Sequence, residues 1–266
     1  MVFGFIGVVH LPPMPGDPLA SPNTTFDSTC DFALADAEAL VEGGVNGIIL
    51  ENFGSSPFPK GDAQNRLPAH QVATLARIAH LCKERFDIPI GVNCLRNDAH
   101  SAIGIAAATH SNFVRVNIHT STFVTDQGVI EGEAHSTLRY RRALGATDIK
   151  ILADVLVKHA QPLVPLSPRL AAEDTVNRGH ADGLIVSGSG TGKPADRGVL
   201  EEVLSGAHGR PVLLGSGLNF ENAATYCDLI DGAICGTALK TDGVLSAPVD
   251  PVRVRKMADI LLSHWA

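Results

Sequence analysis

The chain has 266 residues, a formal net charge of −7 and 45% hydrophobic residues, a composition that excludes a disordered protein. No run of lysine and arginine is present, which argues against nucleic acid as the main partner. No apolar stretch approaches the roughly 18 residues that a membrane span needs. The five cysteines are odd in number and match no metal-binding spacing, which favours buried free thiols in a reducing cytoplasm.

Short apolar runs recur along the chain. Their near-continuous hydrophobicity is typical of parallel strands that are buried on both faces. In chain order we predict strands at Phe3–His10, Gly47–Glu51, Ile90–Cys94, Phe113–Asn117, Lys150–Asp154, Gly183–Ser187, Val212–Gly215 and Ala233–Gly236.

Amphipathic segments alternate with these runs. We predict helices at Cys30–Gly43, Pro68–Arg85, Asp98–Thr109, His135–Leu144, Pro168–Arg178, Arg197–Leu204, Asn222–Cys227 and Pro251–His264. Eight strand–helix units with short connections favour a closed (β/α)8 TIM barrel, and an open doubly wound sheet is the alternative. The length is close to the roughly 250 residues typical of such a barrel. We therefore expect residues 1–266 to form one domain, although two smaller domains would also fit the length.

Three long stretches, Leu11–Thr29, Asn52–Leu67 and His119–Ala134, are predicted to be irregular. They follow the first, second and fourth strands, so a barrel would place them at its carboxyl-terminal face, where active sites are built. In the third stretch, Asp126 could contact substrate, act in a lid or bind Mg²⁺ together with a substrate phosphate. The alternative is that Asp126 only forms a turn before Gly128.

Polar side chains end several strands whose other residues are mostly Ile, Val and Leu. On a barrel, such positions lie where substrates bind. The candidates for substrate binding are His10, Asn52, Asn93, Arg115, Asn117, Asp126 and His159. Asn52 and Asn93 could instead hydrogen-bond a neighbouring loop. The histidines show no HxH or HExxH spacing, so no zinc site is expected.

Three residues are candidates for acid–base catalysis: Glu51, Asp154 and Lys158. Two carboxylates on different strands can divide into an acid and a base when their surroundings separate their pKa values. Lys158 could complete this group if the side chains meet in space. The alternative is a plain ion pair between Lys158 and Asp154. A Schiff-base role would need a desolvated Lys158, and nothing in the sequence requires that role.

Glycine-rich turns follow the last three predicted strands. Glycine lets backbone N–H groups approach an anion closely, and two such turns at neighbouring strand ends can hold a phosphate on a barrel. The candidates for phosphate binding are Ser187, Gly188, Ser189, Gly190, Thr191, Gly192, Gly215, Ser216, Gly217, Gly236 and Thr237. The first turn is not a Walker A motif, because Pro194 follows Lys193 where Ser or Thr should stand. Tight turns without a ligand are the alternative.

The chain resembles the BtpA family in runs that cover nearly its whole length. These runs include Gly7–Leu11, Glu51–Gly54, Gly91–Ala99, Thr125–Gly132 and Ala153–Leu163. The resemblance implies a barrel of the ribulose-phosphate-binding kind, without a settled reaction. The family is named for a photosystem I biogenesis protein and includes proteins of the SgcQ type. One departure is Ser55, where the family usually has an acidic residue.

These features lead us to expect a cytoplasmic enzyme that acts on a small phosphorylated sugar or nucleoside-like metabolite. The expected chemistry is isomerisation, aldol-type cleavage or glycosidic cleavage by acid–base catalysis, with no certain cofactor. The alternatives are a non-catalytic accessory factor for photosystem I or another membrane complex, and a metabolite sensor. Homo-oligomers are common among barrels of this size, so a homo-oligomer also fits.

Overall fold

The computed structural model describes residues 4–188 and 194–265. Within these ranges, eight parallel strands close into a barrel in the order β1-β2-β3-β4-β7-β9-β10-β11, and β11 pairs back with β1. The barrel strands are β1 (Gly4–His10), β2 (Gly47–Glu51), β3 (Ile90–Asn93), β4 (Phe113–Val116), β7 (Lys150–Val155), β9 (Gly183–Val186), β10 (Val212–Leu214) and β11 (Gly232–Cys235). The closed barrel confirms the predicted fold and excludes the alternative of an open doubly wound sheet. Phe3, the predicted first residue of β1, lies outside the described residues.

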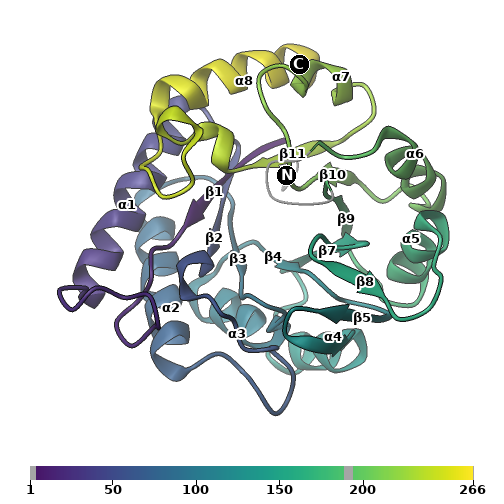
Figure 1. Cartoon of the computed structure of the whole chain (residues 1–266), viewed down its shortest axis with the longest axis horizontal. Coiled ribbons are helices and arrows are strands. Elements are labelled where there is room, and N and C mark those ends of the chain that lie inside the picture. The colour runs from purple at the N-terminus through teal and green to yellow at the C-terminus, as the bar shows by residue number, and fades with distance from the viewer. Residues whose placement is uncertain (1–3, 189–193, 266) are drawn as a thin grey trace.

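Helices form an outer ring around the strands (Figure 1). They are α1 (Phe26–Gly43), α2 (Ala69–Arg85), α3 (Ala99–Thr109), α4 (Ala134–Ala143), α5 (Pro168–Asn177), α6 (Arg197–Gly206), α7 (Ala223–Tyr226) and α8 (Pro251–Trp265), with short 3-10 turns η1 (Phe53–Ser55), η2 (Thr237–Leu239) and η3 (Thr241–Gly243). Helix α1 begins four residues before its predicted start, at Phe26. The reason is a reciprocal cap, in which the side chains of Thr25 and Ser28 each accept the other's backbone N–H.

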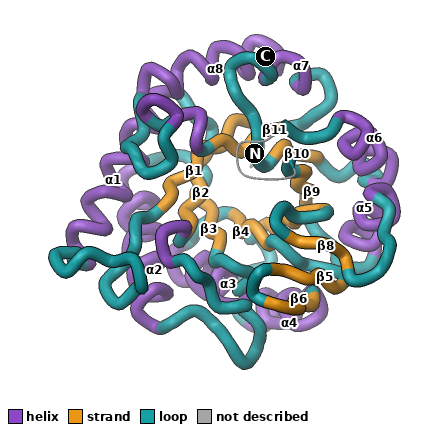
Figure 2. Tube along the Cα trace, in the orientation of Figure 1, coloured by secondary structure: helices purple, strands orange, loops and turns teal. Residues whose placement is uncertain are grey.

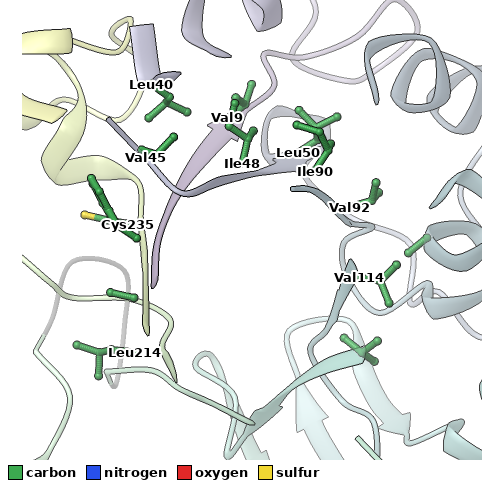
Figure 3. Close-up of a cluster of buried hydrophobic side chains, with 14 of the residues drawn as sticks. Val9, Leu40, Val45, Ile48, Leu50, Ile90, Val92, Val114, Leu214 and Cys235 are labelled. Atoms are coloured by element: carbon green, nitrogen blue, oxygen red, sulfur yellow. The ribbon is translucent and has the colours of Figure 1, made fainter. Parts of the chain in front are cut away.

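One set of alternate strand residues faces the helices. Figure 3 shows Val9, Ile48, Leu50, Val92 and Val114 in this outer layer, and all five are buried. Because neighbouring residues of a strand point to opposite faces, the other set of alternate residues faces the barrel axis.

The barrel interior is filled by a second, separate apolar layer. Its members are Ile6, Val8, Ile49, Phe113, Leu152, Ile185, Leu213 and Ile234. Strand β3 adds no side chain to this layer. Its Gly91 leaves room for the Phe113 ring, because a Cβ there would lie 2.2 Å from that ring. The barrel is therefore packed below its mouth, and a ligand can enter only from above this layer.

A small antiparallel sheet corrects one prediction. The stretch His119–Ala134, expected to be irregular, contains β5 (Thr122–Thr125) and β6 (Gly128–Glu131), and β5 also pairs with β8 (Ala160–Pro162). Figure 2 shows these three strands as a separate sheet beside the barrel. The hairpin forms because its inward side chains, Phe123 and Ile130, join a small buried cluster. Asp126 and Gln127 are left as its two-residue loop.

All five cysteines are free and buried, as predicted. In the part of the chain that the structure describes, no helix combines the length and the apolar character that crossing a membrane requires.

Candidate functional site

Each barrel strand places one residue at the mouth. These residues come two positions after the innermost apolar layer, so the alternation that buries that layer turns them toward the axis as well. In barrel order they are His10, Glu51, Asn93, Arg115, Asp154, Ser187, Gly215 and Gly236. Strand pairing aligns them, since His10 lies opposite Glu51 and Glu51 lies opposite Asn93. The predicted polar strand ends therefore meet at one place.

Two cavities, of about 270 and 420 Å³, open at this mouth. Both are lined by Glu51, Phe53, Arg115 and Lys158. We call the first the turn lobe; its further lining includes Gly215, Ser216, Gly217, Phe220, Gly236, Thr237 and Arg253. We call the second the hairpin lobe; its further lining includes Phe58, Leu95, Arg96, Asn117, Asp126, Gln127 and His159. A ligand that spans both lobes would pass directly over the four shared side chains.

Glu51 is a buried carboxylate at the junction of the two lobes. Its Oε2 accepts a hydrogen bond from Asn93 Nδ2 at 2.7 Å. Burial raises the pKa of Glu51, whereas nearby His10, Arg115 and Lys158 lower it. With the Asn93 hydrogen bond, these groups outweigh burial and hold the pKa of Glu51 below its ordinary value. Glu51 is therefore ionised at neutral pH and can accept a proton.

Asp154 is held in a buried ion pair. Arg115 donates to it twice, from Nε at 3.0 Å and from Nη2 at 2.8 Å. Asn117 Nδ2 and Ser187 Oγ donate to the same carboxylate at 2.8 and 3.3 Å. Burial lowers the pKa of Arg115, but the charge and hydrogen bonds of Asp154, together with the charge of Glu51, outweigh burial and raise it. Among the described residues, the cation within 4 Å of Asp154 is Arg115 and not Lys158, so the predicted alternative of a Lys158–Asp154 pair does not form.

Lys158 lies between Glu51 and the glycine turns. Its Nζ is 3.5 Å from Ser216 Oγ, and its backbone carbonyl accepts a hydrogen bond from Arg96 Nη2 at 2.7 Å. Burial, followed by the positive charge of Arg115, lowers the pKa of Lys158, although Glu51 opposes this shift. The ammonium is thus partly desolvated and placed where it could contact a phosphate or a substrate oxygen.

His10 is held as a neutral imidazole. Burial is the main cause that lowers its pKa from 6.5 to about 4. Its ring meets the edge of Phe53 at a centroid distance of 5.1 Å, and its Nδ1 is buried without a partner in the described structure. Gly236 makes room for this ring, since a Cβ there would lie 2.3 Å from His10 Cε1.

The protein should lose stability as the pH falls from about 6.5 to about 4, in part through His10. In this pH window, His10 binds a proton in the unfolded chain but not in the folded protein. The free energy of unfolding therefore decreases with acidification. Urea unfolding at pH 7 and pH 4.5 should show a smaller loss for His10→Gln than for wild type. His80→Gln, on the exposed face of α2, is the matched control and should keep the wild-type loss. An unchanged loss in His10→Gln would contradict this assignment.

The turns after β10 and β11 leave backbone donors available. The Gly215 amide donates to the Val186 carbonyl at 2.7 Å and is not available. Across residues 4–188 and 194–265, no hydrogen bond from the amides of Ser216, Gly217, Gly236 or Thr237 to a protein acceptor is present. Unpaired amides that converge at a turn are what anion sites use.

Arg253 of α8 adds positive charge to the turn lobe, and the sequence analysis did not select it. Its Nε donates to the Ala238 carbonyl at 2.9 Å, and its guanidinium lies 5.0 Å from the centre of the Phe220 ring. Its sequence position, at the start of the last helix, is far from any strand end. Only the fold brings it to the glycine turns.

Several predicted residues do not reach the lobes. Asn52 is fully buried, and its Oδ1 accepts the Leu95 N–H at 2.8 Å, which is the loop-holding alternative. Among the described residues, Asn93, Asp154, Ser187 and Gly188 also fall outside the lining of both lobes. Ser189, Gly190, Thr191 and Gly192 lie outside the described residues. Ser55, the departure from the family pattern, is buried and donates to Asp17 Oδ2 at 2.6 Å.

The sequence analysis also missed Phe53, Phe58, Leu95 and Arg96, all of which line the lobes. Arg96 carried a usable signal, because it is a charged residue three positions after the end of β3. Within the two described ranges, no group of three or more His, Cys, Asp or Glu side chains is placed to hold a metal ion. A Mg²⁺ ion bound together with a substrate phosphate stays a prediction.

Comparison with known proteins decides the family. The model of the BtpA family matches residues 3–262. The chain belongs to the BtpA family. It is 44% identical to the photosystem I biogenesis protein BtpA of Synechocystis sp., over 94% of this chain and 84% of that protein. It is 40% identical to the protein TK2179 of Thermococcus kodakarensis (96% and 94%), and 30% identical to SgcQ, a protein of the sgc region of Escherichia coli (96% and 92%).

Solved structures share the fold at low identity. KGPDC from Streptococcus mutans superposes with a TM-score of 0.60 at 10% identity, and each chain is covered completely. N-(5'-phosphoribosyl)anthranilate isomerase from Pyrococcus furiosus superposes with a TM-score of 0.56 at 12% identity, over 98% of this chain and 99% of that one. At these identities the likeness establishes the barrel fold alone.

Proposed function

We propose that this BtpA-family barrel is an acid–base enzyme that acts on a small phosphorylated sugar or nucleoside-like metabolite. The observation that carries the proposal is the place of Glu51, an ionised and buried carboxylate at the junction of two lobes, beside Lys158. A buried base next to a desolvated cation, inside a cavity, is an arrangement that serves proton transfer.

The substrate phosphate would occupy the turn lobe. The unpaired amides of Ser216, Gly217, Gly236 and Thr237 supply donors there. Gly215 was predicted to bind phosphate, but its amide already donates a hydrogen bond to the Val186 carbonyl. A Cβ at Gly215 would lie 2.2 Å from Ile185 Cγ2, so glycine is needed there for close packing under the lobe.

In the reaction, Glu51 would take a proton from a carbon or hydroxyl group of the sugar. Lys158 would donate a hydrogen bond or a proton to the oxygen on which negative charge develops. Isomerisation, aldol-type cleavage and glycosidic cleavage all use such a proton transfer. We assign Asp154 a positioning role, because four hydrogen bonds already occupy its two oxygens. It fixes Arg115 at the junction.

Thermal unfolding with matched ligand pairs tests the proposal. Ribose 5-phosphate and glucose 6-phosphate should raise the melting temperature with concentration, while ribose and glucose should not. A ligand at 100 times its Kd adds about 2.7 kcal/mol to the free energy of unfolding. Gly236→Ala should remove the response, because its Cβ would displace His10. Gly104→Ala, in α3, where the added Cβ would lie 3.3 Å from the Tyr140 hydroxyl, should keep it.

The same ligands, with a turnover assay and a membrane-binding assay added, separate the alternatives. A metabolite sensor would be stabilised by a phosphosugar but would turn none over. An accessory factor for photosystem I or another membrane complex, as the name of the Synechocystis relative suggests, would respond to no phosphosugar and would be retained on membranes. That last result would overturn the proposed function.

A further inference from the structure

Arg96 is a cation that lines the hairpin lobe but not the turn lobe. Arg96 follows β3, is 5% exposed and lines this lobe. The structure records one hydrogen bond from its guanidinium, from Nη2 to the Lys158 carbonyl at 2.7 Å. Within residues 4–188 and 194–265, no carboxylate lies within the 4 Å ion-pair distance of Arg96. A guanidinium remains protonated even where burial lowers its pKa.

Arg96 differs in this respect from Arg115, the other arginine of the lobe. Arg115 is matched by the two oxygens of Asp154 at hydrogen-bond distance. Asp126 and Asp154 attract Arg96 only from further away. Taking an unpaired charge out of water is costly unless a partner compensates it. The apolar walls of the lobe, Phe58 and Leu95, add to that cost and strengthen any ion pair that forms there.

We propose that the substrate carries, besides its phosphate, a carboxylate that binds Arg96 in the hairpin lobe. This inference rests on the proposed function, because the phosphate is taken to occupy the turn lobe. A planar carboxylate matches the forked donors of a guanidinium. Nη2 uses one of its two hydrogens on the Lys158 carbonyl, so its second hydrogen can form the fork with Nε or with Nη1. The substrate class is then a phosphorylated sugar acid, or a sugar phosphate joined to a carboxylated group. Its two anionic ends would place the reacting bond over Glu51.

A carboxylate suits this lobe better than a second phosphate. Asp126 lines the same lobe, and its Oδ2 accepts a hydrogen bond from Gln127 Nε2 at 2.5 Å. A second phosphate would bring up to two negative charges toward this carboxylate, whereas a carboxylate brings one. The lobe should therefore prefer the singly charged group.

Calorimetric titration with three ligands tests this inference. Glucose 6-phosphate and 6-phosphogluconate have the same number of carbons and the same phosphate, but only the second has a carboxylate. Wild type should bind 6-phosphogluconate about 10- to 100-fold more tightly, the range expected for a charge-assisted hydrogen-bonded pair. Fructose 1,6-bisphosphate, with a phosphate in place of the carboxylate, should bind more weakly than 6-phosphogluconate.

Four variants assign the preference to this lobe. Arg96→Gln should bind the two six-carbon monophosphates equally and keep the wild-type affinity for glucose 6-phosphate. Arg96→Lys keeps the charge but not the fork and should retain part of the preference, which guards against a folding defect in the first variant. Asp126→Asn removes a negative charge from the lobe and should tighten 6-phosphogluconate binding. Arg139→Gln, at an exposed site on α4, is the matched control.

The outcomes distinguish failure of the carboxylate site at Arg96 from failure of the proposed function. Binding of glucose 6-phosphate without any preference for 6-phosphogluconate would overturn the second anion site and leave the proposed function standing. A preference that survives in Arg96→Gln would also overturn it, as would tighter binding of the bisphosphate. Failure of all three ligands to bind would overturn the proposed function and this inference together.

Discussion

Replacing Glu51 with glutamine should lower turnover by about 10²–10⁴-fold, the usual contribution of a general base, for a phosphosugar that raises the melting temperature. The change is nearly isosteric, and it leaves the turn lobe intact. Phosphate binding, and hence the rise in melting temperature, should persist. Removing this negative charge also takes away an attraction that opposes the lowered pKa of Lys158, so that pKa should fall further. Steady-state kinetics and thermal unfolding on the same preparation give both readouts.

Glu42→Gln is the matched control for this experiment. Glu42 is an exposed residue in the last turn of α1, outside the lining of both lobes. Its variant should keep the wild-type rate. A Glu51→Gln protein that turns over substrate at close to the wild-type rate would remove Glu51 from the catalytic role. In that case the buried carboxylate would only position Asn93.

The second large effect is on stability. Asp154→Asn should reduce the free energy of unfolding by about 3–5 kcal/mol, because it leaves the Arg115 charge buried without its partner. The side chains of Arg115 and Asp154 are 4% and 0% exposed, so solvent cannot compensate the loss. Denaturant unfolding measures the change. If the unpaired charge is the cause, the double variant Arg115→Met, Asp154→Leu should be more stable than Asp154→Asn alone.

An exposed ion pair supplies the comparison. Arg77 and Asp27 lie 2.7 Å apart, but their side chains are 52% and 77% exposed. Asp27→Asn should therefore unfold at the wild-type denaturant concentration, since solvent screens such pairs. If Asp154→Asn were as stable as Asp27→Asn, the view of Asp154 as the anchor of Arg115 would be wrong.

The barrel was predictable because each strand is buried on both faces and reads as one apolar run. Strand β2, for example, has the predicted bounds Gly47–Glu51. The hairpin of β5 and β6 was not predicted. Its strands are four residues long, and its stability depends on β8, which lies far along the chain. The alternation of buried Phe123 and exposed Val124 was the one local signal of a strand.

The candidate site was predictable where the alternation of side chains along a strand decides which residues face the barrel axis. Once a barrel is assumed, the residue two positions after the last inward-facing apolar residue must point toward the axis at the carboxyl-terminal end of its strand. Glu51 lines both lobes there, and Asp154 contacts Arg115, which also lines them. Their pairing was not predictable. Whether Asp154 meets Arg115 or Lys158 depends on the register of β4 against β7, in which Val116 lies opposite Ala153. Arg253 was out of reach for a similar reason, because only the position of α8 over the turns brings it to the lobe.

A crystal structure of the protein with ribose 5-phosphate tests the central claim most directly. The account predicts that the phosphate oxygens lie about 2.7–3.2 Å from the amides of Ser216, Gly217, Gly236 and Thr237. The sugar should extend from there toward Glu51. A phosphate bound elsewhere on the protein, or those amides turned away from a ligand that occupies the lobe, would contradict the account.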